Sequence, residues 1–200
     1  MQSGIENTVT TLLQPWHKAA VSRGKPIMDN KISELFIKAA TSIEIHNTAE
    51  TTWTYTSNPE NWTASNPKEH LGLVFFNEKN RPLENTHFHQ REKVAGVYAD
   101  LKGIILYVDY PHKLVWNGTA RYKILGGLIK LNVAEGGVLQ LQEYDGHTTL
   151  SHDVYMQFPD SIIGKFWHYV FTNIFNARKA VYDHTYRELE FFKSKLDLKK

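Results

Sequence analysis

The sequence predicts an α+β domain in which one long C-terminal helix covers a curved antiparallel β-sheet, with an apolar pocket between the two. Three observations support this fold class. Apolar and polar residues alternate through much of residues 84–158, as they do in half-buried strands. Turn signals interrupt the alternation, and Asp145-Gly146 is typical of a two-residue hairpin. From Ser161 to about Lys195 the apolar residues follow a helical period instead.

The composition favours a globular protein that needs no disulfide bond or structural metal for stability. Of its 200 residues, 42% are hydrophobic, which suffices for a core at this length. The absence of cysteine excludes thiol catalysis, disulfides and thiolate metal ligands, and it fits a reducing compartment. With 23 basic and 21 acidic residues, the net charge of +2 gives no electrostatic reason to expect a nucleic-acid partner.

Two further features predict a cytoplasmic location. Residues 1–11 lack the basic start and continuous apolar stretch of a secretory signal. No segment approaches the ~18 apolar residues of a membrane span, so we expect no integral membrane association. The sequence does not indicate an oligomeric state.

The chain divides into an N-terminal extension, residues 1–32, and a main domain, residues 33–200. Apolar residues between Ile5 and Trp16 recur at helical spacing, and Pro15 interrupts them. One or two short helices on the outside of the domain are expected here, and a partly disordered tail is the alternative.

The domain opens with a strand and two short helices. Residues 33–45 alternate as a strand, and Asn47 is expected to cap the first helix. Asn58-Pro59 begins the second helix, because proline suits the first helical position, and this helix carries Trp62 towards the core.

The remaining strands follow one another along the chain. Gly103 is a candidate bulge, and Gly136-Gly137 is expected to break the sheet. The final helix, over residues 161–195, would be roughly 50 Å long. The strands are expected at residues 71–76, 86–98, 102–109, 113–122, 125–129, 138–144 and 148–158.

Short motifs occur along the chain in a characteristic order. They are Ser42–Trp53, Asn58–Trp62, Asn85–His89, Val94–Gly96, Val108–Pro111, Leu114–Trp116 and Gly146–His152. Over about residues 38–195 their order and spacing resemble the START/Bet v 1-like (SRPBCC) superfamily, nearest its polyketide cyclase/dehydrase and lipid-transport group. The resemblance implies the helix-grip fold of that superfamily, with an apolar cavity between sheet and helix that holds a small hydrophobic molecule or lipid. It implies no cofactor and no particular reaction, and no residue pattern here resembles the catalytic set of the cyclases.

Side chains on the inward faces of the predicted elements are the candidate pocket residues. Trp116 shares a strand face with Gly118 and Ala120, whose small side chains would leave space beneath the helix. His152 lies in the middle of an apolar strand face, so it is either a core histidine bonded to backbone or a group that orients the ligand. The predicted pocket residues are Phe88, Trp116, His152, Met156, Trp167 and Phe171.

Familiar catalytic and metal motifs are missing from the sequence. His87 and His89 share a strand face, but no spacing specifies a third ligand, so no tightly bound metal is expected. Ser151, His152 and Asp153 are neighbours on one strand and point to alternating faces, so they cannot form a hydrolase relay among themselves.

Three function hypotheses follow. The first is a protein that binds, and carries or senses, a small hydrophobic molecule. The second is an enzyme of cyclase or dehydratase type that acts on such a molecule, with His152 or a tyrosine as acid or base. The third is a protein-interaction module like the co-chaperones of the same superfamily. A cavity favours the first two hypotheses, and a polar group facing open space inside it favours the second.

Overall fold

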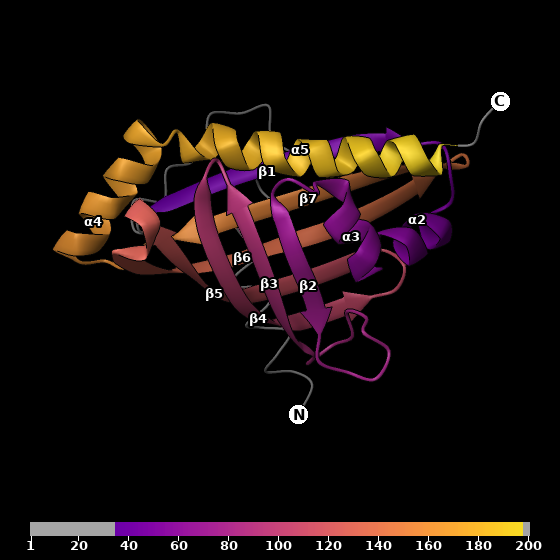
Figure 1. The fold of residues 1–200 in the computed structure, drawn as a ribbon. Helices are drawn as coiled ribbons and strands as arrows, with labels where there is room; N and C mark the ends of the chain where they lie inside the picture. Colours follow the sequence, from indigo (N-terminus) through magenta and orange to yellow (C-terminus); the bar gives the residue numbers. More distant parts are fainter. Residues whose placement is uncertain (1–34, 198–200) are drawn as a thin grey trace. The chain divides into compact units, whose positions relative to one another are not determined.

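A computed structural model describes residues 35–197, and the predicted extension over residues 1–32 lies outside that part. The described residues form a seven-stranded antiparallel sheet with a long C-terminal helix across it (Figure 1), which confirms the predicted α+β class. The strand order is β1-β7-β6-β5-β4-β3-β2, so the first strand pairs with the last. The strands are β1 (Phe36–Ile45), β2 (His70–Phe75), β3 (His87–Val94), β4 (Val97–Asp109), β5 (Lys113–Ile124), β6 (Ile129–Tyr144) and β7 (His147–Gln157).

Two short helices, α2 (Ala49–Thr56) and α3 (Pro59–Ser65), connect β1 to β2, as the sequence predicts. Asn58 caps α3 as expected, and its side chain accepts a hydrogen bond from the backbone of Glu60. The cap of α2 is Thr48 and not Asn47. The Asn47 amide instead donates to the Leu196 carbonyl at 2.9 Å, and so ties this loop to the end of the last helix.

Four predictions about the strands were wrong in detail. The predicted strand 86–98 is a hairpin: Ala95 and Gly96 both have positive φ, and they form a tight turn between β3 and β4. Gly136-Gly137 does not break the sheet, because β6 runs through it. These glycines make room for rings on neighbouring strands, since a Cβ at Gly136 would strike Tyr155.

Gly103 is likewise a position where a neighbouring side chain lies close to the backbone. The register shift in β4 falls between Ile105 and Tyr107, so the predicted bulge at Gly103 is absent. A Cβ at Gly103 would collide with the Phe88 ring, which lies over the backbone there. The segment predicted as a strand over residues 125–129 is a 3-10 turn, Leu125–Gly127, that leads into β6.

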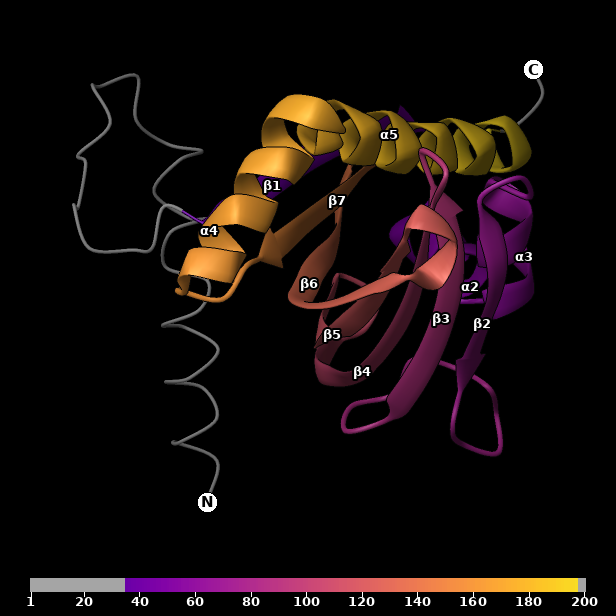
Figure 2. The same cartoon turned by 60° about the vertical axis from the view of Figure 1, so that its left-hand side comes forward.

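The C-terminal helix is broken where a single helix over 161–195 was predicted. Helix α4 (Ile162–Tyr169) continues through a π-helical turn (Val170–Ile174), and α5 (Ala177–Leu196) begins after a kink. The kink occurs at Asn176, which adopts the left-handed conformation with φ 48° that asparagine tolerates. Figures 1 and 2 show α5 lying along the sheet while α4 turns away from the axis of α5.

This break changes which apolar residues of the final segment reach the sheet. Ile162, Ile163 and Phe166 were expected on the covered face, but they are 89%, 68% and 56% exposed. The core instead forms beneath α5, where Leu189 and Phe192 are fully buried with Ile45 and Leu150 of the sheet. No helix among residues 35–197 has the length and hydrophobicity needed to cross a membrane.

Candidate functional site

Two small neighbouring cavities lie on the inner side of the sheet. The first, here called the apolar cavity, has a volume of about 60 Å³. The second, the polar cavity, has a volume of about 100 Å³ and reaches α5. Trp62, Gln90, Trp116 and His152 line both, so they form a shared wall. Other lining residues of the apolar cavity include Trp53, Leu73, Phe75, Phe88, Leu114 and Leu139.

The structure brings four of the six predicted pocket residues to these cavities. Phe88 lines the apolar cavity, Met156 lines the polar cavity, and Trp116 and His152 line both. Phe171 lines neither cavity, because it packs behind Tyr122 and against Phe158. The contact of these six residues with a ligand stays a prediction.

The sixth predicted pocket residue, Trp167, and the small residues Gly118 and Ala120 do not line the two cavities. Trp167 is half-buried on α4, which turns away from the sheet, and it lines neither cavity. Ala120 is fully buried but also lines neither, so its small side chain does not leave the space predicted there. A Cβ at Gly118 would meet the Lys102 carbonyl oxygen at 2.5 Å, so that glycine serves backbone packing.

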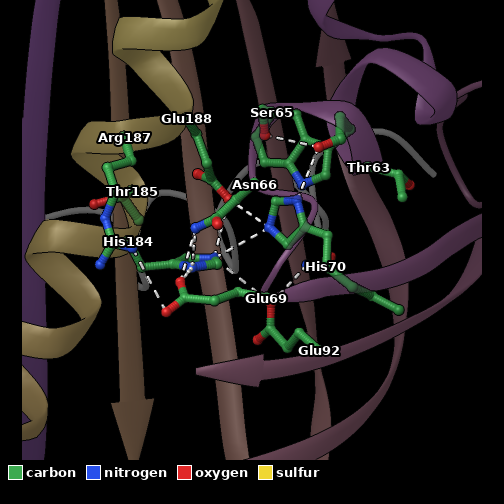
Figure 3. Close-up of polar contacts among 12 residues, drawn as sticks. Thr63, Ser65, Asn66, Glu69, His70, Glu92, His184, Thr185, Arg187 and Glu188 are labelled. Atoms are coloured by element: carbon green, nitrogen blue, oxygen red, sulfur yellow. Dashed lines mark hydrogen bonds and ion pairs between the residues drawn. The ribbon is translucent and has the colours of Figure 1, made fainter. Parts of the chain in front are cut away.

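A carboxylate surrounded by three histidines lies at the wall of the polar cavity. Figure 3 shows two of these histidines, His70 and His184, beside Glu188. Glu188 of α5 is 1% exposed. Its Oε1 lies 2.9 Å from His70 Nε2 and 3.1 Å from His184 Nε2. Its Oε2 lies 3.1 Å from His152 Nδ1. The His152 ring is therefore bonded to a buried carboxylate and not to backbone. Its second proposed role, to orient a ligand, stays a prediction.

Hydrogen bonds to surrounding residues orient two of these histidines, His184 and His70. His184 Nδ1 is 2.7 Å from Glu69 Oε2, and the Asn66 amide donates to the same oxygen at 2.7 Å. His70 Nδ1 donates to the Trp62 carbonyl at 2.8 Å. The sequence builds this arrangement locally, because His184 and Glu188 are one helical turn apart on α5 and Glu69-His70 leads into β2 directly after α3.

The charges in the cluster depend on one another. Burial opposes a charge on His184, but Glu188 and Glu69 outweigh it and raise the pKa of that imidazole to about 11. Burial would raise the pKa of Glu188, yet the charge of His184 and hydrogen bonds from His152, His184 and His70 hold it well below its usual range. Glu188 is therefore an ionised carboxylate inside the domain.

A second buried carboxyl group behaves in the opposite way. Glu135 of β6 lines the polar cavity and accepts a hydrogen bond from the Tyr122 hydroxyl. Burial, reinforced by the nearby charge of Glu92, raises the pKa of Glu135 to about 8. Burial and the Glu135 carboxyl also raise the pKa of Tyr122 well above its ordinary value. Glu135 thus keeps its proton at neutral pH, and the cavity wall holds both a neutral and an ionised carboxyl group.

Two groups of side chains among residues 35–197 have the composition of a metal site. His70, Glu92 and His184 present ligand atoms within 4.8 Å of one another, and both histidines are buried. Glu44, His46 and His147 do the same on the surface. The pair considered from the sequence belongs to neither group: His87 is exposed, and His89 Nε2 bonds Asp100 Oδ1 at 2.7 Å.

Reasoning from sequence missed most of the polar cavity, although one signal was present. Along α5 the core-facing positions include Val181, Thr185, Leu189 and Phe192. His184 and Glu188 fall on that same stripe, where ionisable residues are rarely buried unless paired. No comparable signal marks Glu92 or Glu135, which only the folded sheet brings to the polar cavity, or His70, which it brings against Glu188. These residues are the candidate functional residues that the structure adds.

Comparison with known proteins identifies the fold. No family model matches the chain, and no curated protein matches its sequence. The di-domain ARO/CYC protein BexL from the BE-7585A biosynthetic pathway has a TM-score of 0.62 at 15% identity, over 97% of this chain and 60% of that one. The structure of Ara h 8.0201 has a TM-score of 0.55 at 8% identity, over 80% of this chain and 97% of that one.

A START superfamily protein from Mycobacterium smegmatis is also similar, with a TM-score of 0.51 at 12% identity, over 80% of this chain and 96% of that one. At these identities the likeness concerns the fold alone. The chain has the START/Bet v 1-like helix-grip fold, as its sequence motifs predict.

The raised pKa of Glu135 predicts how stability depends on pH. The unfolded chain loses this proton near pH 4.5 and the folded chain near 8, so the contribution of Glu135 to the free energy of unfolding falls as pH rises between these values and levels off above them. Glu135→Gln keeps an acceptor for Tyr122 and removes the titration. The free energy of unfolding of the variant, relative to that of wild type, should increase by on the order of a few kcal/mol from pH 5 to pH 8.

Urea unfolding in metal-free buffer at several pH values measures this gain. Glu84→Gln, at an exposed carboxyl, is the matched control and should differ from wild type by a constant amount across the range. If the free energy of unfolding of Glu135→Gln also differs from that of wild type by a constant amount at all pH values, the prediction is contradicted.

Proposed function

We propose that this chain binds, and carries or senses, a small, mainly apolar molecule with one hydrogen-bond-accepting oxygen, and that the molecule occupies the two cavities. The observation that carries the proposal is the indole nitrogen of Trp62. Within residues 35–197 this buried Nε1 has no hydrogen-bond partner, although Trp62 belongs to the wall shared by both cavities. A buried donor without an acceptor is unfavourable by about 1–3 kcal/mol, and a ligand oxygen at that point would satisfy it.

The cavity volumes support a molecule of about one ring. An apolar cavity of ~150 Å³ admits benzene, whereas pockets for drug-sized molecules occupy ~300–1,000 Å³. The cavities here, about 60 and 100 Å³, correspond to the smaller scale. A long-chain lipid or a multi-ring molecule would enter only if the shared wall or α5 moved. Cyclohexanone, a single ring with one acceptor oxygen, is therefore a suitable probe.

The occupancy of the polar cavity can be tested by filling it. Ala99 lines the polar cavity at 1% exposure, and Ala120 on the neighbouring strand is 0% exposed but lines neither cavity. Ala99→Leu should weaken cyclohexanone binding at least ~10-fold and change the free energy of unfolding by less than ~1 kcal/mol, because it fills a void. Ala120→Leu should keep the affinity and lose ~1–3 kcal/mol by overpacking.

NMR titration and urea unfolding of both variants measure these quantities. Equal destabilisation by the two leucines, together with unchanged affinity in Ala99→Leu, would count against binding in the polar cavity.

The role of the Trp62 donor can be tested separately from the apolar wall. Trp62→Phe removes Nε1–H while leaving an aromatic ring against His70 and Phe192. Cyclohexanone affinity should fall about 2–10-fold, the value of one neutral hydrogen bond. Methylenecyclohexane, which has the same shape without the oxygen, should change by less than about twofold. Equal losses for the two probes in NMR titrations would assign Trp62 to packing alone.

A second candidate function is acid–base catalysis of the cyclase or dehydratase type. The observation that favours it is the hydrogen-bonded pair of Glu135 and Tyr122 at the polar cavity, since a buried carboxyl that keeps its proton can donate it to a leaving hydroxyl. Among the similar structures are two named as ARO/CYC proteins of biosynthetic pathways. The third hypothesis, an interaction module, has no observation of this kind in its favour.

Dehydration of 3-hydroxycyclohexanone to its conjugated enone tests this candidate by ultraviolet absorption. Wild-type protein should accelerate the reaction over buffer, and Glu135→Gln should lower the rate at least ~100-fold while keeping the affinity for cyclohexanone. A wild-type rate equal to that of buffer would leave binding without catalysis as the function.

A further inference from the structure

Three Lewis-basic atoms form a compact triangle in the cluster around Glu188. His70 Nε2 and His184 Nε2 are 3.1 Å apart, and Glu188 Oε1 lies 2.9 Å and 3.1 Å from them. All three side chains are buried. Figure 3 shows the two imidazole rings converging on this point from β2 and α5.

The three atoms of this triangle all face one another. Both Nδ1 atoms face acceptors on the outside, the Trp62 carbonyl for His70 and Glu69 for His184. The other ring nitrogen, Nε2, of each histidine therefore faces the second ring and Glu188 Oε1.

A metal ion would satisfy all three atoms at once. Three ligand atoms that lie about 2.1 Å from one ion at right angles are separated by about 3.0 Å, which matches the observed edges. Two imidazoles and one carboxylate on one face of an octahedron are a known arrangement for first-row divalent metals. Glu92 Oε2, 3.7 Å from His184 Nε2, lies close enough to become a fourth ligand.

The contacts behind the triangle are those of metal-binding histidines. Such residues present one ring nitrogen to the ion and donate the other N–H to a carbonyl or carboxylate, which fixes the tautomer and the ring orientation. His70 donates to the Trp62 carbonyl and His184 to Glu69, and in both cases Nε2 points into the triangle. His152 contacts the second oxygen of Glu188 and holds that carboxylate in place.

We propose that His70, His184 and Glu188 bind one divalent first-row transition-metal ion, with Glu92 as a further ligand. Glu92, His184 and Glu188 also line the polar cavity, so the remaining coordination positions face it. A water molecule or an oxygen of a cavity-bound molecule would complete the coordination. The site stands independently of the proposed organic ligand, because its geometry uses only side chains of this chain.

This inference runs against the expectation of no tightly bound metal. That expectation rested on missing thiolates and on the lack of a third ligand beside His87 and His89. Only His184 and Glu188 are neighbours, four positions apart on α5; His70 and Glu92 lie 92 to 118 positions from them along the chain (92 to 184, 70 to 188) and come together with them only when α5 lies over the sheet.

Cobalt titration of the full chain tests the site without any organic molecule. After removal of metal with EDTA and dialysis, wild-type protein should take up one equivalent of Co²⁺, with visible absorption bands that Zn²⁺ abolishes by competition. The melting temperature should rise by about 5–10 °C at a Co²⁺ concentration 100-fold above Kd. Uptake of neither Co²⁺ nor Zn²⁺ by the wild-type chain would overturn the proposal, whatever the result with cyclohexanone.

Matched variants locate the bound ion. His70→Asn retains an amide N–H near the position of Nδ1, for the Trp62 carbonyl, and removes Nε2, so it should weaken Co²⁺ binding at least ~100-fold. His147→Asn alters the exposed Glu44-His46-His147 group and should change affinity by less than twofold. The reverse pattern would assign the ion to the surface and overturn the proposal.

A measurement on the wild-type chain covers the case in which His70→Asn does not fold. Long-range ¹H–¹⁵N NMR of the histidine rings should show two rings that keep Nδ1–H and whose Nε2 resonances move on addition of Zn²⁺. Zinc-dependent shifts confined to the rings of His46 and His147 would also refute the buried site.

Discussion

The buried Glu188 carboxylate is the constraint on which the interior of this domain depends. An ion taken out of water is strongly unfavourable unless partners surround it, and removing one partner of a buried pair typically destabilises a protein by about 3–5 kcal/mol. Glu188 meets this requirement with His152 of β7, His70 of β2 and His184 of its own helix. One carboxylate therefore ties α5 to strands from both halves of the sheet.

The same cluster explains why the inside of the sheet has two different regions. Beneath α2 and α3 the wall is almost entirely apolar, and below α5 it carries ionisable groups at close range. Trp62 and Trp116 stand between the two regions, within the shared wall. A molecule that spans them would place an apolar body on one side and an oxygen on the other, as is usual for ligand pockets with a few placed polar groups.

The broken C-terminal helix has a functional consequence as well as a structural one. Because the kink at Asn176 lets α4 leave the sheet, α5 covers the polar cavity without α4, and α5 contributes His184 and Glu188 to its wall. Near the kink, Phe171 packs on Tyr122, which bonds Glu135. The ring packing at the helix break thus supports the neutral carboxyl group from behind, and Phe171 affects the cavity without lining it.

The sequence by itself determined the class of fold, most of the strands in outline and the two short helices. These features follow from local periodicity, caps and turn residues, which act between neighbours in the chain. The same strand periodicity placed Phe88, Trp116, His152 and Met156 on the inner face of the sheet, where they line the cavities. Only the tertiary structure decided the hairpin at Ala95-Gly96, the helix break and the buried cluster. The sequence could not reveal the cluster, because a charged residue is stable in a core only through partners from distant elements, and no local pattern records which elements will meet.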